Sequence, residues 1–194
     1  KSSEHPSKIR VATWNVGTLR RRGSEVAETL TRRRIDLCAV QEHRWAGSLS
    51  PNQTRLIKGK DSSYKFFWSG NDKGLGGAGI LLASKWIDHV FDVQRISDRI
   101  ILVKLIIGKL VFTFLSVYAP QAGLSETQKD HFYDQLQSLV AKIPVSEVLI
   151  PLGDWNGHIG TESCGFEEVH SGQGFGTRNA EGERVLKFAV ANDL

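Results

Sequence analysis

Short runs of hydrophobic residues recur through most of the chain. Some alternate with polar residues, as in half-buried β-strands, and others are continuous, as in buried ones. Runs of this kind predict strands over residues 9–14, 37–40, 64–69, 79–83, 90–96, 100–107, 110–118 and 147–152. The runs 64–69 and 79–83 flank the sequence NDKGLGG, which is typical of a hairpin turn, so we expect these two strands to pair antiparallel. The middle of the chain is therefore expected to consist of consecutive strands.

Three other segments have the spacing of apolar residues that is typical of helices. A short helix is predicted over residues 24–34, with Ser24 as its N-cap and with Val26 and Leu30 on its apolar side. A second helix is predicted from Ser125 to Ile143, ended by Pro144. Asn179 is expected to cap a last helix, and residues 153–177 are predicted to be loop. Strands interleaved with helices predict an α/β or α+β fold built on a sheet.

Composition narrows the class of protein. The chain has 194 residues, of which 40% are hydrophobic and 24% charged, and this favours one soluble domain over residues 1–194. It contains no apolar run of transmembrane length and its N-terminal ten residues are polar, so we expect no membrane association. Its two cysteines, Cys38 and Cys164, do not form a disulfide framework, which favours a nuclear or cytoplasmic location.

Charge is distributed unevenly along the chain. Residues 1–60 contain 13 basic and 5 acidic side chains, whereas residues 61–194 contain 12 basic and 16 acidic ones. The triplets Arg20–Arg22 and Arg32–Arg34 account for much of the difference. A basic half suggests a polyanionic partner such as DNA, although the solvated ends of a helix and a loop would explain either triplet alone.

Polar side chains follow four of the predicted strands at the points where they end. These residues are Asn15, Glu42, Tyr118, Asp154 and Asn156. In a sandwich of sheets such positions gather on one rim, where side chains can face a ligand. Carboxylates, carboxamides and a phenol offer oxygen ligands, which suit a hard cation such as Mg²⁺.

The order of these motifs resembles the endonuclease/exonuclease/phosphatase superfamily. The motifs that carry the resemblance are TWNVGTL, VQEHRW, GGAGILLA, SVYAP, LGDWNGHIG and RNAEGERVLKFAVANDL, and they span nearly the whole chain. Within that superfamily, the sequence resembles the endonuclease domains of non-LTR retrotransposons, particularly the RTE-like group, and host proteins that carry such a domain. The resemblance implies a four-layer α/β sandwich, in which two packed mixed β-sheets are flanked by helices.

The resemblance also implies roles for the residues at the strand ends. Glu42 would be the principal Mg²⁺ ligand, supported by Asn15, with Mn²⁺ as an alternative metal. Asp154 would orient and deprotonate the attacking water, Asn156 would hold a phosphate oxygen, and Tyr118 would stabilise the charge that develops on the phosphate. These roles agree with the chemistry of phosphodiester cleavage, which places extra negative charge on phosphoryl oxygens.

Other residues are expected to contact DNA. The candidates are Arg44, Arg20, Arg21, Arg22 and Asn179, the last at the end of a glycine-rich loop that resembles the retrotransposon branch. Trp45, Trp68 and Trp155 could stack on bases, although packing within the protein is the default interpretation for each of them. His158, Cys164 and His170 do not have the spacing of a compact zinc module.

Two departures from the family pattern bear on activity. Gly17 stands where abasic-site repair members have an aspartate, and the chain ends at Leu194, without the final strands and the Ser-Asp-His motif of the family. We therefore expect a C-terminally truncated domain of low or no activity. We also expect an exposed sheet edge, which self-association or a partner chain would cover.

Three functions are consistent with the sequence. The first is a Mg²⁺-dependent DNA endonuclease domain of retrotransposon type that nicks one strand. The second is a catalytically dead descendant of such a domain, used for binding or assembly. The third is a phosphomonoesterase of the same superfamily, which the basic N-terminal part disfavours.

Overall fold

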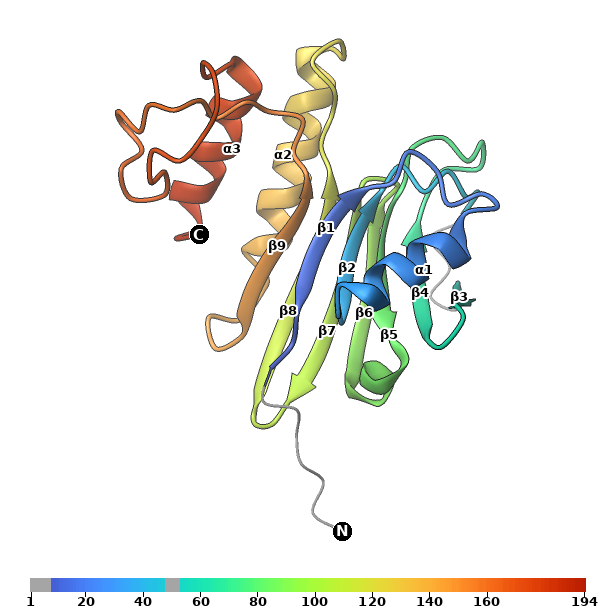
Figure 1. Ribbon diagram of the computed structural model, residues 1–194. Helices are drawn as coiled ribbons and strands as arrows, with labels where there is room; N and C mark the ends of the chain where they lie inside the picture. Colours follow the sequence, from blue (N-terminus) through green and yellow to red (C-terminus); the bar gives the residue numbers. More distant parts are fainter. Residues whose placement is uncertain (1–7, 48–52) are drawn as a thin grey trace. The chain divides into compact units, whose positions relative to one another are not determined.

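A computed structural model describes residues 8–47 and 53–194 (Figure 1). The expectation of a polar N-terminal segment rests mostly on Lys1–Ser7, which lie outside the described residues. The chain forms two compact units. The first consists of the described part of Lys1–Tyr118 together with Val145–Asp154, and the second consists of Ala119–Pro144 and Trp155–Leu194.

Two mixed sheets make up most of the first unit. The described residues form one sheet of five strands and one of four, with bounds β1 Val11–Asn15, β2 Leu37–Gln41, β3 Thr54–Lys58, β4 Ser63–Ser69, β5 Ala78–Ala83, β6 Val90–Ser97, β7 Ile100–Ile107, β8 Leu110–Tyr118 and β9 Val148–Asp154. The strand orders are β1-β2-β5-β4-β3 and β6-β7-β8-β9. The pairs β1–β2 and β8–β9 are parallel, and the others are antiparallel.

The two sheets pack face to face through alternate residues of their strands. Because successive side chains on a strand point to opposite faces, β2 and β5 send one set of residues toward the second sheet. The buried core between the sheets includes Leu37, Phe67, Ile80, Leu82, Ile101, Val103, Leu105 and Phe114. This packing confirms the predicted α/β sandwich of two mixed sheets.

Helix α1, Gly23–Arg32, covers the other face of the first sheet (Figure 1). Its buried residues Val26, Ala27 and Leu30 belong to a second core cluster that contains Cys38, Val40, Phe66 and Leu81. The prediction that Ser24 caps this helix was wrong. The helix begins one residue earlier, and among the described residues no side chain caps it.

Pairings of the central strands agree with the sequence pattern. β4 and β5 pair antiparallel across the glycine-rich turn, and β6, β7 and β8 form the predicted meander. Strand β3 and the short 3₁₀ helix η1, Ser84–His89, were not predicted. The outer strands among the described residues are β1 and β3 in one sheet and β6 and β9 in the other. The partner chain expected at a sheet edge stays a prediction.

The second unit contains helices α2, Glu126–Val140, and α3, Ala180–Ala191. Ser125 caps α2 in a capping box with Gln128, and Asn179 caps α3 through Gly182, as predicted. Helix α2 ends before the predicted Ile143. The backbone N–H groups of Lys142 and Ile143 donate to the carbonyls of Leu139 and Val140, three residues earlier, which is the hydrogen-bond pattern of a 3₁₀ turn rather than of an α-helix.

Side chains of α2 and α3 contact one another within this unit. The Lys129 ammonium lies 2.8 Å from Glu126 and 2.7 Å from Glu181, and the rings of Tyr133 and Phe188 are 6.3 Å apart. Within α3, Leu186 and Phe188 are buried while Val190 is 40% exposed. Neither helix, nor any other over the described ranges, is long and apolar enough to cross a membrane.

A nearly buried ion pair joins β7 to the residue before β9. Lys104 and Glu147 are 12% and 11% exposed and lie 2.8 Å apart, and Thr113 donates to the same carboxylate at 2.5 Å. Burial would raise the pKa of Glu147, but the hydrogen bonds from Lys104 and Thr113 hold it below its usual value. The carboxylate is therefore ionised at neutral pH and compensates the buried ammonium.

Replacing Glu147 with glutamine should lower the free energy of unfolding by about 3 kcal/mol at pH 7, because Lys104 would be left buried and unpaired. A carboxyl with a lowered pKa stabilises the fold above its unfolded pKa of about 4.3 and loses that contribution as the pH falls through the folded pKa. Urea denaturation should therefore show a smaller difference from the unmodified chain at pH 3. The double variant Lys104→Met/Glu147→Gln is the control and should recover most of the loss. An equal difference at both pH values would contradict this account.

Candidate functional site

Four strand ends of the first unit bring four polar side chains together. Asn15 ends β1, Glu42 follows β2, Tyr118 ends β8 and Asp154 ends β9. The Asn15 amide nitrogen donates to Glu42 Oε1 at 3.0 Å and to Asp154 Oδ2 at 2.9 Å. The Tyr118 hydroxyl donates to Glu42 Oε1 at 3.0 Å. These four residues are called the carboxylate site below, and all four were predicted to meet.

The orientation of the Asn15 amide follows from its hydrogen bonds. Its Oδ1 accepts a bond from the Gly17 backbone N–H at 3.0 Å, so the NH₂ group must face the two carboxylates. Asn15 therefore acts as a donor that holds Glu42 and Asp154 close together. Its predicted role as a metal ligand stays a prediction.

Glu42 occupies a backbone conformation that is rare for a residue with a side chain. Its φ is +55°, and the φ of Arg44 is +56°. Strain of this kind persists only where the surrounding structure enforces it, and it is concentrated at functional sites. The Asn15 amide, with help from Tyr118 and Arg44, holds the pKa of Glu42 below its usual value despite partial burial. The side chain is therefore an anion at neutral pH.

The turn between β4 and β5 fixes the backbone beside Glu42. The backbone N–H groups of Glu42 and Arg44 donate to the carbonyls of Gly77 and Gly76, at 3.0 and 2.9 Å. Gly77 has φ +97°, and a Cβ there would overlap the ring of His43. Glycine is required at this position because the backbone approaches that ring so closely.

His43 is a structural residue of this region. It is fully buried, and burial lowers its pKa to about 4, so the ring is neutral. Its Nδ1 accepts from the Trp45 backbone N–H at 3.0 Å, so the proton lies on Nε2, which faces the Ser69 carbonyl at 3.0 Å. The ring thus ties the segment after β2 to the end of β4.

Gly153 positions Asp154 at the end of β9. It pairs with Val117 in the parallel β8–β9 ladder, where a Cβ would overlap the Val117 carbonyl. The next pair in the register is Tyr118 with Asp154. The close approach permitted by glycine therefore sets the phenol and the carboxylate side by side.

Asn156 belongs to the second unit. Its side-chain nitrogen donates to the Ala119 carbonyl at 2.7 Å, and its φ is +47°. Asparagine tolerates this left-handed conformation better than most residues. Its predicted contact with a phosphate oxygen stays a prediction.

The predicted arginines have different surroundings. Arg44 lies 3.2 Å from Glu42 Oε2, at the edge of the carboxylate site. Arg20 donates to the carbonyl of Arg44 at 2.6 Å and so braces the same segment, and Arg22 pairs with Glu25 at 3.1 Å. Arg21 lines a cavity near the start of α1. Contact of these arginines with DNA stays a prediction.

The donor set of the carboxylate site fits a hard divalent cation. Two carboxylates, Glu42 and Asp154, approach the same amide nitrogen, and oxygen is the ligand atom that each of them offers. Mg²⁺ binds through one or two carboxylates and keeps several waters. Among the described residues there is no cluster of three or more His, Cys, Asp or Glu side chains that could hold a metal. Glu42, the predicted principal ligand, is the residue that would hold Mg²⁺ there, and this assignment stays a prediction.

Residues 158–179 of the second unit form a hydrogen-bonded loop. His170 Nε2 lies 3.3 and 3.1 Å from the carbonyls of Ile159 and Gly160, and its Nδ1 accepts from Gly172 at 2.9 Å. Asn179 Oδ1 accepts from the backbone of His158 at 3.0 Å as well as from Gly182. Asn179 therefore ties the loop to α3, and its contact with DNA stays a prediction.

Sequence reasoning missed Arg99 beside the carboxylate site. Its guanidinium donates to the Tyr118 carbonyl at 3.1 Å and lies 5.1 Å from the centre of the Tyr118 ring. A cation over the ring steadies the phenol that reaches Glu42. Arg99 follows the break between two predicted strands, and a turn arginine gives no sequence signal of such a contact.

Comparison with known proteins supports the resemblance inferred from the motifs. No family model matches the chain. Craniofacial development protein 2 of Bos taurus is 25% identical over 185 residues, which cover 95% of this chain and 30% of that protein. The chain thus spans less than a third of the length of this relative.

Solved structures show the same fold. An AP endonuclease from Archaeoglobus fulgidus has a TM-score of 0.63 and 20% identity, over 95% of this chain and 70% of that one. The endonuclease domain of TRAS1, a telomere-specific non-LTR retrotransposon, has a TM-score of 0.59 and 18% identity, with the same coverage. These likenesses confirm the fold that the motifs predicted.

Proposed function

We propose, on the premise that this chain has the fold of the endonuclease/exonuclease/phosphatase superfamily, that it is a metal-dependent DNA endonuclease domain. The observation that carries the proposal is the carboxylate site, in which Asn15 bridges Glu42 and Asp154 while Tyr118 bonds to Glu42. The TRAS1 domain, whose fold is similar, is an endonuclease of a non-LTR retrotransposon. We extend that description to this chain as part of the proposal, with Mg²⁺ as the metal and nicking of one strand as the reaction.

Each residue of the site has a part in this reaction. The ionised Glu42 would hold the cation, and Asp154 holds a water molecule and accepts its proton during attack on phosphorus. The bond from phosphorus to the 3′-oxygen breaks as the new P–O bond forms, and the leaving oxygen becomes a 3′-hydroxyl. The Tyr118 hydroxyl and the Asn15 amide are donors that can stabilise the charge gained by the phosphoryl oxygens. Bound Mg²⁺ would supply Lewis-acid stabilisation of that same charge.

The basic N-terminal part of the chain supports DNA as the substrate. Six of the 25 Lys and Arg residues form two arginine triplets next to α1. The triplet at 20–22 precedes the helix, and the triplet at 32–34 begins at the last residue of the helix. Both described cysteines are free, which is consistent with DNA inside the cell as the substrate. A strongly salt-dependent affinity for DNA is expected from such a surface.

Conversion of supercoiled plasmid to the open circle tests the proposal. The chain should nick plasmid slowly in the presence of Mg²⁺, in keeping with the low activity expected from the sequence, and not in EDTA. Asp154→Asn should lower the rate by about 10²- to 10⁴-fold, because asparagine cannot accept the proton from water. Asp61→Asn, which changes an exposed carboxylate in the turn between β3 and β4, is the matched control and should retain the activity.

Absence of Mg²⁺-dependent nicking by a chain shown to be folded would overturn the proposal of an endonuclease. Equal rates for the unmodified chain and Asp154→Asn would overturn the role of the carboxylate site. If a folded chain binds DNA but does not nick it, the result would favour the second function consistent with the sequence, a catalytically dead domain used for binding.

A further inference from the structure

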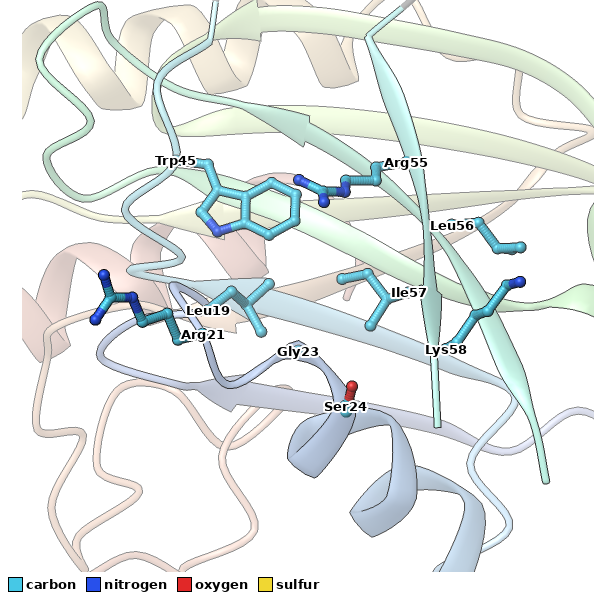
Figure 2. A pocket seen from close by; sticks show the side chains of 9 residues that line it. All are labelled: Leu19, Arg21, Gly23, Ser24, Trp45, Arg55, Leu56, Ile57 and Lys58. Atoms are coloured by element: carbon cyan, nitrogen blue, oxygen red, sulfur yellow. The ribbon is translucent and has the colours of Figure 1, made fainter. Parts of the chain in front are cut away.

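A cavity of about 460 Å³ lies in the first unit beside α1 and β3 (Figure 2). Its walls come from the loop that follows β1, from the segment that follows β2, and from β3. A volume of this size is typical of sites that hold a small organic molecule. The cavity does not include the four residues of the carboxylate site.

An aromatic and apolar surface lies at the base of the cavity. Leu19 and Ile57 are buried there, and Trp45 stands beside them (Figure 2). Edge contacts of 5.3 Å with Phe66 and Trp68 hold the Trp45 ring in place. The indole is therefore fixed before any ligand arrives, which reduces the entropy that binding would cost.

The rim of the cavity is cationic. It carries Arg21, Arg55 and Lys58, and none of the described residues that line it is acidic. The Arg55 guanidinium reaches from β3 toward the indole, with its carbon 5.3 Å from the ring centre (Figure 2). A planar cation that lies over an aromatic ring is held flat by it, and its outer face is a surface on which a nucleobase can stack.

The start of α1 adds to this positive potential. Gly23 and Ser24 line the cavity, and no side chain of the described residues caps the helix there. The first backbone N–H groups of a helix lack acceptors within the helix, and they carry partial positive charge. Together with Arg21 and Lys58 they would attract a phosphate.

We propose that this cavity binds one unpaired nucleotide of a DNA strand. The base lies against Trp45 and Arg55, and the phosphate faces Arg21, Lys58 and the first turn of α1. The bases of a duplex are stacked on each other, so the flat surfaces of the cavity can be used only by an unpaired base. This inference rests on the proposed function, because it names a part of the substrate.

The cavity lies close to the carboxylate site along the chain. Trp45 follows Glu42 by three residues, which span at most about 11 Å. A DNA strand covers that distance in roughly three nucleotides at 3.4 Å each. The same strand can therefore reach both places, and DNA with a short unpaired segment beside the cut should be preferred over uniform duplex.

Fluorescence anisotropy of labelled DNA tests the proposal, with single-stranded DNA and a hairpin duplex as probes in EDTA. Arg21→Gln/Lys58→Gln, which changes the two side chains placed against the phosphate, should weaken binding of the single strand at least about 10-fold and lower its log–log salt slope by roughly 1.4, the value for two lost phosphate contacts. The control is Lys109→Gln/Lys142→Gln, which removes the same charge from two exposed sites. It should change the affinity less than about twofold by the same electrostatic reasoning.

A second variant separates stacking from charge. Arg55→Lys keeps the positive charge but loses the planar guanidinium, and exposed Arg55 can be replaced without disturbing the core. Single-strand binding should weaken about 5-fold, whereas duplex binding should not change. Equal losses for both probes, or a loss that matches the control variant, would overturn the proposal.

Binding in EDTA is independent of cleavage, so the two proposals fail separately. If the chain binds single strands through Arg55 but does not nick plasmid, the proposed nucleotide-binding cavity stands and the endonuclease proposal is overturned. If the chain nicks plasmid but Arg55→Lys binds single strands as tightly as the unmodified protein, the endonuclease proposal stands and the proposed nucleotide-binding cavity is overturned.

Discussion

Replacing Glu42 with glutamine should lower the rate of Mg²⁺-dependent nicking about 10³-fold. Glutamine keeps the shape and can still accept the bonds from Asn15 and Tyr118, which lie 3.0 Å from Glu42 Oε1. It removes the negative charge that would hold the cation. Loss of a bound metal removes several kcal/mol of charge stabilisation, and about 4 kcal/mol corresponds to this fall in rate.

Two measurements identify the cause of this loss. Nicking gives the rate, and the melting temperature with and without Mg²⁺ reports binding, because a ligand that binds only the folded state stabilises it. The unmodified chain should melt higher with Mg²⁺, whereas Glu42→Gln should not. Glu28→Gln, an exposed substitution on α1, is the matched control. Wild-type nicking by Glu42→Gln would show that Glu42 is not the metal ligand.

Replacing Gly153 with alanine should destabilise the first unit by about 3 kcal/mol or more. The new methyl group would overlap the carbonyl oxygen and the side chain of Val117, its partner in the ladder between β8 and β9. Relief of this overlap requires β8 and β9 to separate at the end that carries Tyr118 and Asp154. The variant should therefore lose nicking activity as well as stability.

Urea denaturation measures this effect, provided that the dependence on urea concentration stays the same. Gly108→Ala is the control. Gly108 also has a conformation that favours glycine, with φ +63°, but its missing Cβ has no heavy atom within 4 Å. That variant should cost only about 1 kcal/mol, the penalty of the backbone conformation. Equal losses for the two variants would contradict the proposed overlap at Gly153.

The two sheets could be predicted because their strands carry local signals. The apolar runs at 64–69 and 79–83 flank a glycine-rich turn, and they pair antiparallel in the structure. β3 was missed because its pattern is mostly exposed, with Ile57 as its one buried position. A strand that buries a single side chain has little hydrophobic pattern to detect, and its neighbour in the sheet decides its conformation.

The N-terminal caps of two helices were predicted correctly, and that of the third was not. Ser125 and Asn179 cap α2 and α3 as expected, since each accepts from the backbone of the first turn. Ser24 does not cap α1, which begins at Gly23 against the side chain of Ile57. The start of α1 is thus set by packing on β3, which a local capping rule does not include.

The sequence by itself determined every described strand except β3, the three α-helices and the motifs at the strand ends, because these depend on neighbouring residues. Motif order also identified Asn15, Glu42, Tyr118 and Asp154. Only the tertiary structure decided how those side chains bond to one another and that Arg55 of β3 lies beside Trp45 to form a cationic cavity. These contacts join residues as far apart as 15 and 154. Sheet packing creates such proximity, and no local pattern in the chain encodes it.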